Sequence, residues 1–209
     1  MGTPDQSRRR VLGALLALAA LPTWAGPRGE EELSAAVRAS LQHAVADDGD
    51  RHTAFSDPLH AEAWLSAMAA KLARYMPDEA ARLRFLRTVS WESARAGLDP
   101  QLVLALIQVE SRFRKYAVSP VGAMGYMQVM PFWLRAIGQP GQDLFQLRTN
   151  LRYGCTILRY YIDQERGNLF RALGRYNGSL GQPGYPVMVV NAWKRNWSYL
   201  PPTQEAALR

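Results

Sequence analysis

Cysteine is almost absent from this chain of 209 residues, since Cys155 is the single one. One thiol excludes an internal disulfide and a thiolate metal cluster. The three histidines, His43, His52 and His60, lack the paired spacing of metal ligands. We therefore expect a fold held together by its apolar core, with no metal and no cofactor.

Apolar runs long enough to cross a membrane are also missing. The run from Val11 to Leu21 has about eleven residues, well below the roughly 18 that a transmembrane helix needs. Three arginines, Arg8 to Arg10, precede this run, and Thr23-Trp24-Ala25 offers small residues for cleavage. The pattern predicts that residues 1–25 are an export signal, read by the Sec or the Tat route and then removed. The mature protein is expected in the periplasm, without a stable membrane anchor.

The composition is that of a globular protein with a basic surface. Hydrophobic residues make up 48% of the chain and charged residues 21%, which excludes general disorder. The formal net charge of +7 falls to roughly +5 once residues 1–25 are removed. An exported basic protein suits an anionic polymer such as peptidoglycan better than nucleic acid, although a generally basic surface would have the same charge.

Apolar residues recur at helical spacing along most of the chain, which predicts an all-α fold. We expect helices over residues 30–45, 57–75, 78–96, 99–110, 131–138, 150–162, 168–177 and 186–197. The valine run after Pro186 has strand propensity, but proline at a first helical position favours a helix. Residues 26–97 are predicted to be a helical lead-in that packs on a catalytic domain of residues 98–199, followed by a mobile tail, 200–209.

One stretch in the middle of the chain combines a buried helix, an acid and a glycine-rich loop. The expected apolar helix ends at Glu110, where loss of hydration would favour the neutral acid that proton donation requires. In the loop that follows, Gly122 and Gly125 can adopt positive φ or let another chain approach closely. The alternative is an ordinary glutamate at a helix end, paired with Arg112 or Arg114.

Several runs around this glutamate resemble the SLT-type lytic transglycosylases, lysozyme-like enzymes that cleave peptidoglycan. They are Glu110-Ser111, Ala117-Val118-Ser119, Gly122 to Gln128, Met130-Pro131, Asn150-Leu151 and Tyr176-Asn177. The chain departs from the family at Tyr126, where leucine is usual, and at Gly178-Ser179, which replaces Ala-Gly. A second Glu-Ser pair, Glu92-Ser93, lacks the loop.

The resemblance implies a lysozyme-like fold and lytic transglycosylation by Glu110. This residue would protonate the MurNAc–GlcNAc bond and then take a proton from the C6 hydroxyl of MurNAc, which leaves 1,6-anhydro-MurNAc. The resemblance also implies substrate-binding roles for Ser111, Met127, Gln128, Tyr176 and Asn177. Among these, Tyr176 is the best candidate to hold the glutamate or the reacting sugar.

A second catalytic carboxylate is not evident, although most glycoside hydrolases need two. The acids after Glu110 are Asp143, Asp163, Glu165 and Glu205, and none lies in the motif region. This scarcity favours a mechanism with one glutamate.

Two alternatives stay open at this point. A goose-type lysozyme would use water in place of the C6 hydroxyl on the same fold, and a wall-binding scaffold would keep the cleft without turnover. The expected partner is the glycan strand of peptidoglycan. A role in opening the wall for secretion or conjugation machinery is compatible with the resemblance. The oligomeric state does not follow from the sequence.

Overall fold

The computed structural model describes residues 33–46, 54–55 and 57–199, and the regular structure of these residues is helical. The elements are α1 (Ala35–Ala46), α2 (Pro58–Leu72), α3 (Glu79–Arg95), α4 (Pro100–Ser111), α5 (Phe132–Ile137), α6 (Leu147–Gln164), α7 (Leu169–Asn177), α8 (Gly184–Ala192) and the π-helix η1 (Trp193–Trp197). The expected all-α class is confirmed. The predicted export signal and C-terminal tail lie outside the described residues.

Short polar side chains set most of the helix starts. Asp57, Asp78, Asp99 and Asn168 each accept a hydrogen bond from a backbone N–H two or three residues further on, at 2.6 to 3.2 Å. Such a bond satisfies one of the backbone donors that a helix leaves free at its N-terminus. These four starts are therefore predictable from local sequence.

The first helix differs from its expected bounds. Leu33 and Ser34 precede α1, and the Ser34 hydroxyl accepts a hydrogen bond from the backbone N–H of Val37 at 3.3 Å. A capping serine at this position fixes the helix start. The helix consequently begins at Ala35 and not at Glu30, as the row of glutamates had suggested.

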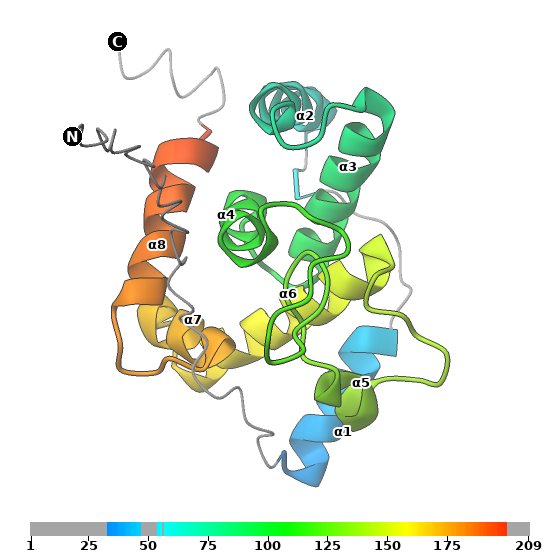
Figure 1. Ribbon diagram of the computed structural model, residues 1–209, viewed down its shortest axis with the longest axis vertical. Helices are drawn as coiled ribbons and strands as arrows, with labels where there is room; N and C mark the ends of the chain where they lie inside the picture. Colours follow the sequence, from blue (N-terminus) through cyan, green and yellow to red (C-terminus); the bar gives the residue numbers. More distant parts are fainter. Residues whose placement is uncertain (1–32, 47–53, 56, 200–209) are drawn as a thin grey trace, which may run out of the picture.

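Helix α4 occupies the middle of the molecule (Figure 1). It packs against α3, α8 and η1, while α6 joins α3 to α7. All six residues from Leu102 to Ile107 are at most 4% exposed. A helix that is apolar around its whole circumference is stable only inside a core, so the sequence of α4 dictates its central place.

The helices before residue 97 attach to different parts of the molecule. Helix α3 packs on α4 and α6, α2 packs on α3 and η1, and α1 packs on α5 and α6. The boundary of the predicted lead-in at residue 97 stays a prediction. None of the described helices is long and apolar enough to span a bilayer.

Glu92, from the second Glu-Ser pair, lies in the core as the centre of an ion cluster. It is 2% exposed, and its carboxylate accepts hydrogen bonds from Arg95 at 2.8 Å and from Arg152 at 3.1 and 3.2 Å. The same two arginines donate to the carbonyl oxygens of Ala44 and Val45 at the end of α1. Cations at a helix C-terminus complement its dipole, so this cluster fastens α1 to α3 and α6.

Candidate active site

The end of α4 is a strained turn directly after Glu110 and Ser111. Arg112 and Phe113 both adopt left-handed backbone conformations, with φ of 52° and 63°. Such conformations are unfavourable for residues other than glycine and persist where the surroundings impose them. The buried ring of Phe113 supplies that restraint, because its centroid lies 5.0 Å from that of Tyr75 and 5.3 Å from that of Trp197.

Hydrogen bonds from two residues of the π-helix η1 also hold the last turn of α4. The side-chain oxygen of Gln108 accepts hydrogen bonds from the indole N–H of Trp197 at 2.7 Å and from the amide of Asn196 at 3.1 Å. Gln108 precedes Glu110 by two residues. The orientation of the helix end is therefore fixed on both sides of the glutamate.

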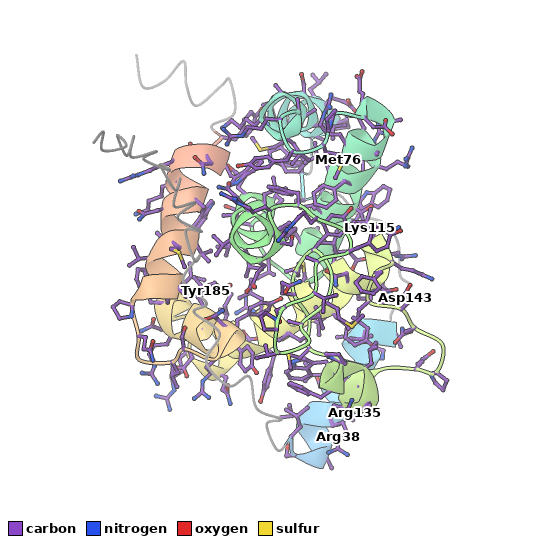
Figure 2. All side chains as sticks on the ribbon, in the orientation of Figure 1. Arg38, Met76, Lys115, Arg135, Asp143 and Tyr185 are labelled. Atoms are coloured by element: carbon purple, nitrogen blue, oxygen red, sulfur yellow. The ribbon has the colours of Figure 1, made fainter. Side chains whose placement is uncertain are left out.

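Glu110 is half-buried and lies next to a tyrosine of α8. The hydroxyl of Tyr185 donates a hydrogen bond to Glu110 Oε1 at 2.6 Å. Tyr185 is 2% exposed, and Figure 2 labels it on α8, the helix that packs against α4. A short bond to a rigid, buried donor restricts the rotation of the carboxyl group. Glu110 is thereby held in one orientation.

The glycine-rich loop is closed by hydrogen bonds within itself. The side-chain amide of Gln128 donates to the carbonyl oxygens of Ala117 and Gly125, at 3.1 and 2.9 Å. Met124 forms isolated β-bridges with Val118 and Val129. Gln128 is 5% exposed, so the hydrogen bonds of its amide shape the loop from inside.

Asn150, at the start of α6, holds the same loop from outside. Its Oδ1 accepts a hydrogen bond from the backbone N–H of Met127 at 2.8 Å, and its Nδ2 donates to the carbonyls of Met124 and Leu144, both at 2.9 Å. Gly125 has φ of 75°, and a Cβ there would lie 2.3 Å from Asn150 Nδ2. Glycine is thus required for both the turn and the close approach.

Tyr176 contacts the loop through its hydroxyl. The hydroxyl donates to the carbonyl oxygen of Met127 at 2.8 Å, and the Met127 side chain is fully buried. The one hydroxyl proton of Tyr176 is therefore used on the loop, whereas Tyr185 donates to Glu110. The role expected for Tyr176, to hold the glutamate or the reacting sugar, stays a prediction.

The other two expected binding residues are buried. Ser111 is 1% exposed, and its hydroxyl donates to the carbonyl of Ile107 at 3.2 Å. Asn177 is 5% exposed and ends α7, directly before Gly178, which has φ of 80°. Substrate contacts of Ser111, Met127, Gln128, Tyr176 and Asn177 stay predictions.

One residue of the site, Tyr185, and the role of a second, Asn150, do not follow from the sequence. Tyr185 lies 75 residues from Glu110, and no local pattern pointed to it. Asn150 was singled out by family resemblance, but its role as a clamp on the loop was not foreseen. For Asn150, an amide at the start of an amphipathic helix was the available signal.

The other acids that follow Glu110 have partners of their own. Asp143 is exposed and accepts a hydrogen bond from the backbone N–H of Phe145 at 2.8 Å. Asp163 pairs with Arg159. Glu165 pairs with Arg171 and Arg175, which hold the pKa of its carboxyl below the ordinary value, with Arg171 the larger cause. Glu205 lies outside the described residues.

Cys155 is a fully buried residue of α6. Burial raises the pKa of its thiol, and the negative charge of Glu92 raises it further. A buried neutral thiol is inert and behaves as a small apolar group. The structure thus supports the expectation that Cys155 fills the core.

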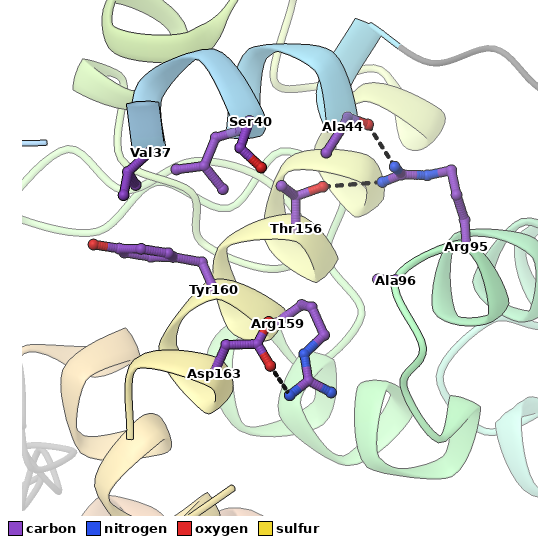
Figure 3. A pocket seen from close by; sticks show the side chains of 10 residues that line it. Val37, Ser40, Ala44, Arg95, Ala96, Thr156, Arg159, Tyr160 and Asp163 are labelled. Carbon is purple, nitrogen blue, oxygen red and sulfur yellow. Dashed lines mark hydrogen bonds and ion pairs between the residues drawn. The ribbon is translucent and has the colours of Figure 1, made fainter. Parts of the chain in front are cut away.

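A cavity of about 260 Å³ lies between α1, the end of α3 and α6 (Figure 3). The guanidinium of Arg95, in its wall, donates to the Ala44 carbonyl and to the Thr156 hydroxyl, and Arg159 pairs with Asp163. The bonds of Arg95 join α3 to α1 and α6, whereas Arg159 and Asp163 pair within α6. The cavity therefore belongs to the attachment of α1 and holds none of the residues of the Glu110 site.

Comparison with known proteins finds a matching family model. Residues 88–186 match the family described as Transglycosylase SLT domain. The transglycosylase of Enterobacteria phage PRD1 is 33% identical over 103 residues, which are 49% of this chain and 38% of that protein. The membrane-bound lytic murein transglycosylase C of Photorhabdus laumondii is 32% identical over 117 residues, 56% of this chain and 30% of that protein.

A solved structure, the lytic transglycosylase Slt of Pseudomonas aeruginosa, is 26% identical, with a TM-score of 0.41 over 73% of this chain and 26% of that one. The matches thus cover 38% and 30% of the two curated relatives and a quarter of this larger protein. Glu110, the loop around Met127, Tyr176 and Tyr185 all lie inside the matched residues. This stretch, just under half of the chain, is thus similar to the transglycosylase SLT domain family.

Proposed function

We propose that this protein is a lytic transglycosylase that cleaves the MurNAc–GlcNAc bond of peptidoglycan with Glu110 as its catalytic acid and base. The observation that carries the proposal is the hydrogen bond of 2.6 Å between Tyr185 and Glu110, inside the matched SLT domain. A catalytic acid must be held at one angle to the bond that it protonates. Tyr185 supplies this restraint from a different helix.

Both proton transfers of the proposed reaction use Glu110. In the first, the Glu110 carboxylic acid gives its proton to the glycosidic oxygen as the bond from that oxygen to C1 of MurNAc breaks. In the second, the carboxylate takes the proton of the C6 hydroxyl as the C6 oxygen bonds to C1. The product is 1,6-anhydro-MurNAc, no water is consumed, and Glu110 ends in its starting form.

The partners of the described acids after Glu110 support a mechanism with one carboxylate. Asp143, Asp163 and Glu165 are each engaged by a backbone N–H or an arginine. A hydrolytic glycosidase normally places a second carboxylate opposite the acid. With one carboxylate, the nucleophile is the C6 hydroxyl of the substrate itself.

The decisive experiment is digestion of purified sacculi with mass spectrometry of the released muropeptides. The wild-type protein is expected to release products one water lighter than muropeptides with reducing ends. Glu110→Gln should lower the rate by about 10²- to 10⁴-fold, because a positioned acid contributes this much. Glu79→Gln, an exposed change in the first turn of α3, is the control and should retain full activity.

Two other results would replace the proposal. Reducing-end products would mean hydrolysis of the goose-lysozyme type on the same fold. Binding to sacculi without soluble product, by a folded wild-type protein, would mean a scaffold for wall proteins.

The proposed place of action is the periplasm, where the substrate is found. Export by residues 1–25 is part of this proposal. Fractionation of cells that express the chain with and without these residues tests it, and periplasmic protein from the shortened chain would reject the export signal.

A further inference from the structure

A pocket of about 160 Å³ lies between α2 and α3. Phe55, Trp64 and Trp91 form its aromatic wall, and the ring centroids of Phe55 and Trp64 are 5.3 Å apart. The backbone N–H of Ala54 donates to the Ser90 hydroxyl at 3.2 Å, which fixes the segment that carries Phe55 against α3. The wall is thus built from three segments of the chain and contains no residue of the Glu110 site.

Two opposite charges line this pocket without pairing with any residue that the structure describes. Glu62 of α2 and Arg87 of α3 both line the pocket, and both are exposed. Among the described residues, neither side chain forms an ion pair or a hydrogen bond. On the same helix as Arg87, by contrast, Glu92 and Arg95 pair in the core at 2.8 Å. The charges of Glu62 and Arg87 are available to a ligand.

The wall also contains an unsatisfied donor. Trp64 is 1% exposed, and its indole Nε1 has no hydrogen-bond partner within the described part of the chain. A buried donor without an acceptor is costly and rare in folded proteins. Where such a group persists, a water, an ion or a ligand commonly completes the site.

The size of the pocket limits the ligand to one small group. Pockets for drug-sized molecules measure roughly 300 to 1,000 Å³, so 160 Å³ accommodates about one amino-acid unit and not a disaccharide. A neutral sugar would leave both Glu62 and Arg87 unmatched. A ligand with a carboxylate and an ammonium around an aliphatic chain matches both charges and the aromatic wall.

We propose that the pocket between α2 and α3 binds the zwitterionic end of an uncrosslinked peptidoglycan stem peptide, with Arg87 on its carboxylate and Glu62 on its ammonium group. This inference rests on the proposed peptidoglycan substrate. Stem peptides supply both charges where the amine of their diamino acid is not crosslinked. The pocket would bind a stem peptide while the glycan strand lies at Glu110. The protein would therefore bind uncrosslinked peptidoglycan more tightly than crosslinked peptidoglycan.

Titration calorimetry with a synthetic stem tripeptide that ends in its diamino acid tests the proposal. The peptide is used with its diamino-acid amine free, with this amine acetylated, and with its terminal carboxylate amidated. Loss of either charge should weaken binding roughly tenfold, as should Glu62→Gln or Arg87→Gln in the protein. Glu62→Gln should not weaken binding of the acetylated peptide further, and Arg87→Gln should not weaken binding of the amidated peptide further.

Glu79→Gln and Arg84→Gln are the matched controls, because both residues are exposed on α3 and neither lines the pocket. Their affinity for the free peptide should equal that of the wild type. No binding of the free peptide, or equal binding by all variants, would overturn the proposal. Because the titration involves no turnover, a protein that binds the peptide but releases no anhydro product would reject the proposed reaction and leave the pocket standing.

Discussion

Gly154 on α6 lies so close to Met127 that a Cβ on this glycine would be 2.4 Å from the Met127 sulfur. Both residues are buried, so neither can move aside into solvent. The Met127 backbone is meanwhile held by Asn150 and by Tyr176. The loop next to Glu110 thus packs closely on α6 at this point, where one methyl group decides whether it fits.

Gly154→Ala is expected to destabilise the protein by about 1 to 3 kcal/mol, the usual cost of adding a methylene to a packed core. Chemical denaturation measures the change, and the sacculus assay should show a parallel loss of activity. Met127→Ala in the same protein makes room for the new methyl, so the double variant should lose less stability than the two single changes together. Additive losses would mean that the two side chains do not press on each other.

Tyr185→Phe should slow the reaction with little effect on the fold. Removal of the hydroxyl frees the Glu110 carboxyl to rotate, and misplacement of a catalytic group by about 1 Å costs on the order of 10²-fold. The measurement is steady-state kinetics on purified glycan strands. A fall in kcat with KM nearly unchanged identifies a positioning residue, because substrate binding does not depend on the angle of Glu110.

Tyr176→Phe is the comparison for Tyr185→Phe. It removes the hydrogen bond to the Met127 carbonyl and should act through the loop, with a stability loss of about 1 kcal/mol. If Tyr185→Phe retained the wild-type kcat, Tyr185 would not be the group that orients Glu110.

Asn150→Ala is expected to loosen the loop around Met127. The change removes the partner of one buried N–H and of two carbonyls, and each buried group left unpaired costs about 1 to 3 kcal/mol. Hydrogen exchange of the Met127 amide should accelerate far more than exchange in α3. Unchanged protection of this amide would show that the loop is held without Asn150.

Local sequence signals account for the helices of this fold better than for its site. Asp57, Asp78 and Asp99 cap helices within their own first turn, so three residues of context suffice to predict these starts. The π-helix over Trp193–Trp197 has no such signal, because it depends on where α4 places Gln108. Tertiary contacts thus set the π-helical form of these residues, which local sequence propensity does not predict.

The hydrogen-bond partners of Tyr176 and Tyr185 are likewise not predictable from local sequence. The motif around Tyr176 marks its place near the loop, but the direction of its hydroxyl follows from the packing of α7. Tyr185 reaches Glu110 across 75 residues, a pairing that exists only once α8 lies on α4. For Glu92, the missing loop indicated that it was not the catalytic acid, whereas Arg95 and Arg152 became visible as its partners only in the fold.

The last prediction concerns acid stability at the corner between α6 and α7. Arg171, and then Arg175, hold the pKa of Glu165 below its ordinary value. A depressed carboxyl pKa contributes stability above the pKa of the unfolded chain, about 4.3 for glutamate, and this contribution is lost as pH falls through the lower folded value. Glu165→Gln should therefore lower Tm at pH 7, and its difference from the wild type should shrink below pH of about 4. Thermal unfolding followed by circular dichroism from pH 7 to pH 3, with Glu79→Gln at an exposed residue of α3 as the control, gives both curves. A Tm difference that stays constant over this range would mean that the charge of Glu165 does not fasten α7 to the end of α6.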